Sequence, residues 1–242
     1  DDDLVWTWVE NPYWQHFCGE TYFQHQPPID PSSMTRWRQR VGEEGVEWLL
    51  TETIEAARRG KVVKASSFEK IIIDTTVMEK AVAYPTDRRL LERGRQHLVK
   101  LAGVLGIRLR QNYNREAPRL AVKVGRYARA KQYRRMQTSL KALRTLVGRV
   151  WRDIDRKLDW QDDVQTTKAS GILARVKRLL EQKPKDKNKL YSLHAPEVEC
   201  IGKGKARHPY EFGVKVTVAT THKEGLVVGI RSLPGNPYDG HT

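Results

Sequence analysis

The amino-acid sequence predicts an α/β protein in which a helical N-terminal region precedes a small sheet, and a long helical segment interrupts that sheet. The run Ile71–Val77 contains three consecutive isoleucines and is typical of a strand that is buried on both faces. Near the C-terminus, residues 210–219 alternate between apolar and polar side chains, and residues 226–230 follow after a turn. These two segments predict a hairpin. Between the first strand and the hairpin, leucines recur at helical spacing.

The N-terminal region predicts short helices interrupted by prolines, and it holds five of the seven tryptophans. Tryptophans at this density are more typical of a small helical core than of a platform for stacking bases. Ser32 or Ser33 is expected to cap a helix that carries Arg36, Arg38 and Arg40. Arg36 and Arg40 share one helical face. That face suits a helix inserted into a DNA groove, and equally a packing helix with a basic outer side.

Asp74 stands inside the first predicted strand, which spans roughly residues 70–77. A carboxylate in a buried strand is unfavourable unless a metal ion, a cation or hydrogen bonds compensate for its lost hydration. One interpretation is an acid at a strand end that caps a turn. The other is a ligand for a catalytic metal ion. The strand alone leaves both interpretations open.

The middle of the chain predicts three helices. Apolar residues line one face of a helix from Leu90 to Leu105, of a longer helix from Met136 to Leu158, and of a shorter helix from Ile172 to Leu180. Lysines and arginines fill the opposite faces. After these helices, a charged linker and a flexible basic loop, Gly202–Arg207, lead into the hairpin.

The positive charge of the chain is concentrated in this middle segment. Residues 86–160 contain 21 Lys and Arg against 6 Asp and Glu, whereas the rest of the chain is neutral and the whole carries a net charge of +15. So local a surplus predicts a polyanionic partner, DNA or RNA. DNA or RNA is expected before a membrane, because no segment approaches the roughly 18 apolar residues needed to span one. Two cysteines form no disulfide framework or zinc cluster, so a cytoplasmic location is expected.

Together these features resemble the bacterial insertion-sequence transposases that have an RNase H-like DDE catalytic domain. The resemblance is carried by Asp74 in its strand, by Tyr-Glu-Phe-Gly-Val-Lys-Val at 210–216 and by Leu-Pro-Gly-Asn-Pro-Tyr-Asp-Gly-His at 233–241. Residues 17–38 resemble the helical domain that precedes catalysis in those enzymes. The resemblance is weakest over the basic middle segment.

The resemblance implies metal-dependent cleavage and strand transfer on double-stranded DNA, at the terminal repeats of a mobile element and at its target. Such chemistry uses two divalent ions, Mg²⁺ or Mn²⁺, held by carboxylates from different elements. Asp74 matches the first acid of the family. Asp239 is a candidate metal ligand, but it follows the third strand, whereas the second acid of the family follows the fourth. A homodimer would suit an enzyme that pairs two element ends, and nucleoid association would suit its substrate.

The predicted domain is incomplete. The fourth strand, its acid and the helix that bears Glu are not found before Thr242, and the first residues include no initiator Met. We therefore expect a fragment that is inactive alone. The alternative is a non-catalytic DNA-binding remnant or regulator made from a truncated transposase gene. Without a fourth strand, one edge of the first strand lacks a partner and an apolar face lacks cover, so we expect a marginally stable or aggregation-prone chain.

The segments are expected to have the following boundaries: a helical DNA-binding region at 1–62, the first RNase H-like strand at 63–85, a basic helical insertion at 86–182, a charged linker and basic loop at 183–209, and strands two and three of a mixed sheet at 210–242. The cationic side chains expected to contact DNA are Arg36, Arg38, Arg40, Arg126, Arg134, Arg135, Lys203, Lys205 and Arg207.

Overall fold

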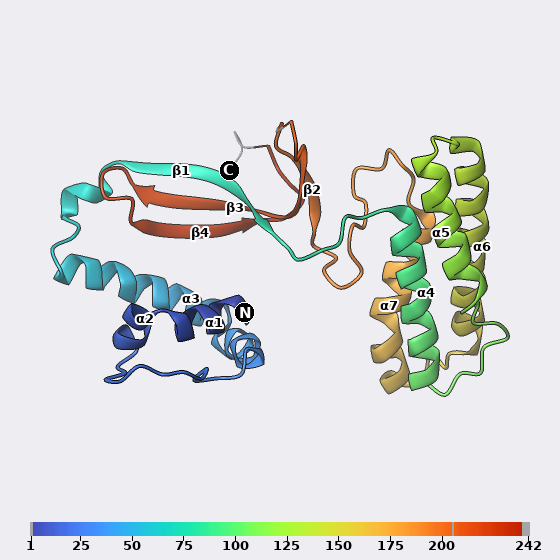
Figure 1. Cartoon of the computed structure of the whole chain (residues 1–242), viewed down its shortest axis with the longest axis horizontal. Helices are drawn as coiled ribbons and strands as arrows, with labels where there is room; N and C mark the ends of the chain where they lie inside the picture. The colour runs from blue at the N-terminus through green and yellow to red at the C-terminus, as the bar shows by residue number, and fades with distance from the viewer. Residues whose placement is uncertain (1, 205, 239–242) are drawn as a thin grey trace. The chain divides into compact units, whose positions relative to one another are not determined.

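The computed structural model describes residues 2–204 and 206–238 (Figure 1). Within these ranges it contains seven α-helices, one short 3₁₀ helix and four strands, so the predicted α/β class is confirmed. The chain divides into two compact units. One comprises the residues up to Ile73 together with Ala219–Gly229, and the other comprises Asp74–Val218 together with the residues from Ile230 onward.

The N-terminal helices are α1 (Asp2–Glu10) and α2 (Pro12–Phe17). Asn11 begins α2 by accepting hydrogen bonds on its side chain from the backbone N–H groups of the second and third helical residues, at 3.0 and 3.2 Å. The buried amide of Gln15 donates to Trp8 O and Gln24 O and accepts from Gln24 N, so it ties both helices to the segment that follows.

The prediction of a tryptophan core in this region is wrong for four of the five tryptophans. Trp8 is buried, but a group of large aromatic side chains is exposed at Trp6, Trp14, Trp37 and Trp48. For Trp6 and Trp14 the reason is the shortness of α1 and α2, which bury little more than Val5, Trp8 and Gln15. Helices of six and nine residues offer only one or two turns of apolar face. Trp37 and Trp48 lie on the long helix that follows, Ser32–Arg59, which buries none of its residues.

Helix α3 (Ser32–Arg59) carries the predicted basic face, and the 3₁₀ helix η1 (Ala65–Phe68) follows it. The prediction of a serine cap is wrong, because Ser32 already belongs to the helix and its backbone N–H donates to Asp30 Oδ1 at 2.9 Å. Gly42 has a φ of 63°, a left-handed conformation that favours glycine, and it interrupts the helix.

The sheet consists of β1 (Ile71–Glu79), β2 (Glu199–Gly202), β3 (Tyr210–Thr221) and β4 (Val227–Leu233), and β3 pairs with each of the others. The predicted first strand and hairpin are thereby confirmed. β2 pairs antiparallel with β3, with Glu199 opposite Gly213. β2 falls within the predicted linker, where a strand of four residues beside glycines and lysines gave no periodic signal.

The isoleucine run predicted that strand β1 is buried on both faces, and this prediction is wrong. Within the described residues β1 pairs with β3 alone, so it is an edge strand. The side chains of Ile71, Ile72 and Ile73 are 46%, 47% and 62% exposed, and Asp74 is exposed as well. An apolar run indicates burial only when other elements cover it, and the described residues leave this run uncovered.

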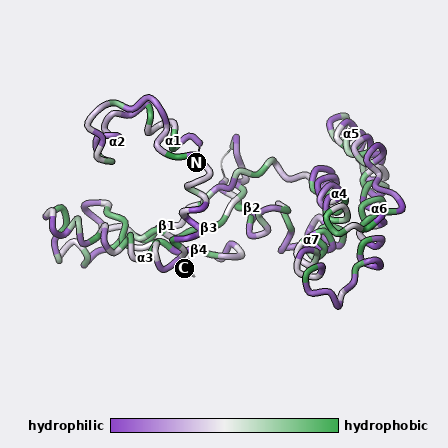
Figure 2. The backbone as a smooth tube through the Cα atoms, turned by 90° about the horizontal axis from the view of Figure 1, so that it is seen from below, coloured by the Kyte–Doolittle hydropathy of each residue, from purple (hydrophilic) through white to green (hydrophobic). Residues whose placement is uncertain are grey.

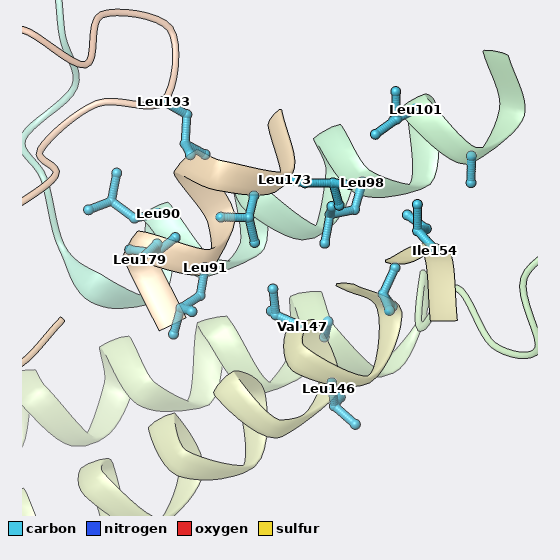
Figure 3. Packing of buried hydrophobic residues seen from close by; sticks show 14 of the residues in the cluster. Leu90, Leu91, Leu98, Leu101, Leu146, Val147, Ile154, Leu173, Leu179 and Leu193 are labelled. Atoms are coloured by element: carbon cyan, nitrogen blue, oxygen red, sulfur yellow. The ribbon is translucent and has the colours of Figure 1, made fainter. Parts of the chain in front are cut away.

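The basic segment forms a helical bundle of α4 (Asp87–Val104), α5 (Glu116–Arg129), α6 (Tyr133–Lys157) and α7 (Asp163–Glu181). Helix α6 packs against the other three, and α4 packs against α5 and α7. The predicted leucine faces meet in its core (Figure 3), where Leu91, Leu98, Val147 and Ile154 are completely buried. Burial of this apolar area is the main stabilising contribution.

The sequence predicted three of these helices and missed α5. The buried face of α5 consists of small residues, Ala117, Ala121, Val124 and Gly125, rather than leucines. The prediction rested on leucines at helical spacing, and α5 separates apolar from charged residues with small side chains instead. These small side chains let α5 approach its neighbours closely. At Gly125 a Cβ atom would lie 3.0 Å from the guanidinium carbon of Arg88 on α4.

Candidate nucleic-acid interface

The surface of the helical bundle is dominated by cationic side chains. Figure 2 shows hydrophilic residues along all four bundle helices, alternating with the hydrophobic residues of the core. Of the 21 Lys and Arg in residues 86–160, all but Arg88, Arg95 and Arg144 are exposed. Within the described residues, two of the 21 form an ion pair with a carboxylate, Arg95 with Glu92 and Lys157 with Asp153. The charge on this surface is therefore largely uncompensated within the described residues.

His97 on α4 lies among several cations of the bundle, including Arg175 of α7. Partial burial lowers the pKa of His97 below its ordinary value, and Arg175, Arg93 and Lys100 lower it further. An imidazole surrounded by guanidinium and ammonium groups resists a further positive charge. The positive field of these cations also attracts phosphate groups.

The structure brings one predicted DNA contact, Arg126, together with further cations on α5. Arg126, Arg119 and Lys123 line a hollow of about 590 Å³. The ammonium nitrogen of Lys123 lies 5.8 Å from the centre of the Tyr127 ring. The other predicted contacts in the bundle, Arg134 and Arg135, are exposed at the start of α6 and do not line this hollow.

The predicted basic face of α3 is formed in part. Arg36 and Arg40 line one hollow of about 400 Å³ together with Trp37. The guanidinium of Arg36 also donates to Ser32 Oγ at 3.1 Å. Arg38 is exposed but is not among the lining residues.

The basic loop between β2 and β3 is closed by a backbone hydrogen bond from Lys203 N to Pro209 O at 3.0 Å. Arg207 is exposed and Lys203 is half-buried. Lys205 lies outside the described residues. The loop can therefore present at least one cation to a ligand, and its role in binding DNA stays a prediction.

Asp74, the predicted catalytic acid, is exposed on β1, and its Oδ1 accepts a hydrogen bond from Thr75 N at 2.8 Å. Across residues 2–204 and 206–238, no three His, Cys, Asp or Glu side chains come together in a way that would hold a metal ion. Asp239 lies outside the described residues. The roles of Asp74 and Asp239 as ligands of Mg²⁺ or Mn²⁺ therefore stay predictions.

Sequence reasoning missed a cluster of arginines in the bundle. Arg149, Arg152 and Arg156 of α6 line one hollow together with Arg110 from the loop after α4. The spacing of three and then four residues on α6 was a usable signal for a shared face. The predicted contacts Arg134 and Arg135 lie at the other end of the same helix. The contribution of Arg110 depends on a tertiary contact that no local pattern reveals.

Comparisons with known proteins show that the N-terminal part of the chain is similar to a family of transposase domains. Residues 1–40 match the profile of a family described as "Transposase domain (DUF772)". The chain is also similar to "Uncharacterized protein ORF8 in nfe locus" of Rhizobium meliloti, with 50% identity over 133 residues, 55% of this chain and 64% of that protein. The match thus spans less than two thirds of the relative's length. No solved structure matches the chain significantly.

The match of residues 1–40 suggests a transposase-related function. In the described ranges, no helix combines the length with the apolar composition needed to cross a bilayer.

Proposed function

We propose that this chain is the DNA-binding portion of an insertion-sequence transposase, and that its basic bundle holds double-stranded DNA. One observation carries the proposal: the exposed cations of residues 86–160 have few carboxylate partners within the described residues. The transposase-domain match at residues 1–40 supports the same class.

The physical basis of binding would be the release of counterions from DNA. Each Lys or Arg that approaches a phosphate displaces condensed cations from the duplex, so the affinity falls as salt concentration rises. A surface of this kind positions DNA without reading its sequence. Sequence readout at the terminal repeats would fall to groove contacts, for which the face of α3 with Arg36 and Arg40 is the candidate.

The proposal includes a catalytic role for Asp74 in the enzyme as a whole. Exposed on β1, its carboxylate is accessible to a metal ion and to a DNA strand. A divalent ion, when bound, would activate a water molecule or a 3′-hydroxyl and stabilise the charge that develops on the phosphate. The contribution of this chain would be one ligand and the placement of the DNA.

The experiment is a titration of a fluorescent duplex of about 30 base pairs, followed by anisotropy at salt concentrations from about 50 to 200 mM. We expect the affinity to fall by roughly 10³-fold or more over that range, as for a protein with at least six phosphate contacts. The triple variant Arg119→Ala/Lys123→Ala/Arg126→Ala is expected to bind more weakly and to show a shallower salt dependence.

The matched control is Lys183→Ala/Lys185→Ala/Lys187→Ala, which removes the same charge from exposed positions in the segment that follows α7. Its affinity is expected to change much less than that of the α5 variant. Binding that is absent, or that does not respond to salt, would overturn the proposal.

A second candidate function is a non-catalytic DNA-binding remnant or regulator. The observation behind it is the same set of exposed cations on the bundle, which needs no catalytic centre in order to bind DNA. Both candidates predict DNA binding. Only the transposase function predicts that Asp74→Asn abolishes strand cleavage at element ends in the presence of Mg²⁺, with DNA affinity unchanged.

A further inference from the structure

A second basic hollow, of about 300 Å³, lies between α6 and the loop that follows α4. It is lined by four arginines, one glutamine, one tyrosine and one aspartate: Arg110, Arg149, Arg152, Arg156, Gln111, Tyr113 and Asp153. All of these residues belong to the second compact unit. We call this hollow the arginine pocket.

The positive charge of the arginine pocket is not neutralised within the described residues. Its one carboxylate, Asp153, is buried and already bonded, since it accepts from Arg110 N at 2.8 Å and pairs with Lys157 Nζ at 3.1 Å. In the described part of the chain, none of the four lining arginines forms an ion pair with a carboxylate. Their guanidinium groups therefore retain donors for a ligand.

The loop side of the arginine pocket is held in place by buried and charged groups. Lys157 Nζ, besides pairing with Asp153, donates to Arg108 O at 2.6 Å. Further along the loop, the buried guanidinium of Arg95 donates to Asn112 O at 2.9 Å. Directly after the second anchor, Tyr113 adopts a left-handed conformation with a φ of 54°, which is uncommon for a non-glycine residue. The lining is thus a built site rather than a chance hollow in a loose loop.

The helix side places three arginines along one face of α6. Arg156 Nε donates to Arg152 O at 3.1 Å, so Arg156 lies back along the helix. Gly148 makes room for Arg152, whose Nη1 lies 3.2 Å from the position that a Cβ of Gly148 would occupy. These guanidinium groups and that of Arg110 line the same hollow from two different elements.

We propose that the arginine pocket binds a tetrahedral oxyanion, and that this oxyanion is a backbone phosphate of DNA. The second part of this inference rests on the proposed function. The planar fork of a guanidinium matches the oxygen atoms of a phosphate and forms paired charge-assisted hydrogen bonds. Gln111 and Tyr113 add neutral hydrogen-bonding groups to the lining. A phosphate held here would fix one point of the duplex on the bundle, in addition to the general attraction of the charged surface.

The first test compares DNA binding by wild type, by Arg149→Ala/Arg152→Ala/Arg156→Ala and by the control Lys183→Ala/Lys185→Ala/Lys187→Ala. The exposed arginines lie on a helix, where alanine is well tolerated, and thermal melts would verify folding. We expect the triple arginine variant, called the pocket variant, to bind DNA roughly tenfold more weakly than the control. The slope of log affinity against log salt concentration is expected to fall by about 1 more in the pocket variant than in the control. Arg152→Lys keeps the charge without the fork and is expected to lose part of the affinity.

The second test follows the side-chain Nε–H signals of arginine in the ¹H–¹⁵N spectrum while inorganic phosphate replaces chloride at constant ionic strength. We expect saturable shifts in wild type that are lost in the pocket variant.

The two tests separate the possible failures. If wild type binds DNA and the pocket variant matches the control, the inference is overturned while the proposed function stands. If phosphate shifts the signals but DNA does not bind, the oxyanion site is supported with free phosphate as its ligand, and the proposed function fails. Absence of saturable shifts overturns the site.

Discussion

The buried carboxylate of Asp153 on α6 accepts a hydrogen bond from the backbone N–H of Arg110 at 2.8 Å, although the two residues are 43 positions apart in the sequence. Asp153 is 5% exposed and also pairs with Lys157. The hydrogen bond from Arg110 lowers the pKa of Asp153, and the hydrogen bond and charge of Lys157 lower it further. This contact joins the loop after α4 to the helix that it crosses.

Replacing this carboxylate in Asp153→Asn is expected to destabilise the chain by about 1–2 kcal/mol near neutral pH, because the amide loses the ion pair and the charge-assisted hydrogen bond. The pKa of Asp153 is lower in the folded state. Its stabilisation is therefore present above the ordinary value of about 4 and is lost as the pH falls through the lower folded pKa. Urea unfolding of wild type and variant should show curves that converge below about pH 4. The control is Asp155→Asn, at a half-buried position on the same helix. If the difference in unfolding free energy between wild type and Asp153→Asn did not change with pH, the prediction would be contradicted.

The buried guanidinium of Arg95 gives a second prediction. Arg95 is 3% exposed, pairs with Glu92 at 2.6 Å and donates to Asn114 Oδ1 at 2.6 Å. Arg95→Met leaves a largely buried carboxylate without its partner, and we expect a loss of about 3–5 kcal/mol in the free energy of unfolding. Restoring neutrality with Arg95→Met/Glu92→Gln is expected to recover part of that loss. Chemical denaturation measures both variants, with exposed Arg93→Ala as the control within about 0.5 kcal/mol of wild type.

The third prediction concerns the close approach of β1 to β3 at Gly213. A Cβ at this position would meet the carbonyl oxygen of Met78 and lie 2.8 Å from the Cα of Glu79, and both are backbone atoms with little room to move. Gly213→Ala is expected to destabilise the sheet by roughly 2 kcal/mol or more through overpacking. Gly229→Ala on β4, where the nearest atom would be 3.6 Å away, is the matched control. Equal melting temperatures for the two variants would count against this account.

The exposed edge of β1 gives a fourth prediction. An apolar strand with an unpaired edge is a template for association with another chain, and a lysine in such a strand opposes it. We expect wild type to self-associate at high concentration and Ile72→Lys to shift the sample toward monomer. Sedimentation velocity measures the distribution of monomers and larger assemblies. The control is Lys70→Ala at an exposed position, which removes a charge instead of adding one and is expected to leave association as strong or stronger. A wild-type sample that stays monomeric and melts cooperatively would refute the expectation of an aggregation-prone chain.

The limits of sequence reasoning follow from particular residues. Leu91, Leu98 and Ile154 recur at helical spacing and are large, so both the helices and their buried faces could be predicted. Ala117 and Ala121 of α5 are buried as well, but a prediction based on leucines at helical spacing does not find a helix whose buried face consists of small residues. The strand at Ile71 could be predicted, whereas its exposure could not, since burial depends on covering elements rather than on the strand itself.

The candidate site shows the same division. The surplus of charge in residues 86–160 could be read from the sequence, and the bundle displays it. The arginine pocket could not be predicted from the sequence, because Arg110 reaches α6 through a loop whose path is set by Asp153 and Arg95. A hydrogen bond between residues so far apart leaves no trace in either local sequence.

The placement of the bundle between β1 and β3 also sets an order of events during synthesis. After the ribosome has completed β1 at Glu79, the 130 residues from 80 to 209 must be added before β3 begins at Tyr210. At roughly 5–20 residues per second this takes about 7–26 s. The bundle helices make mainly local contacts and can assemble meanwhile. Throughout that interval the nascent chain carries an isoleucine-rich segment whose pairing strand has not yet been made.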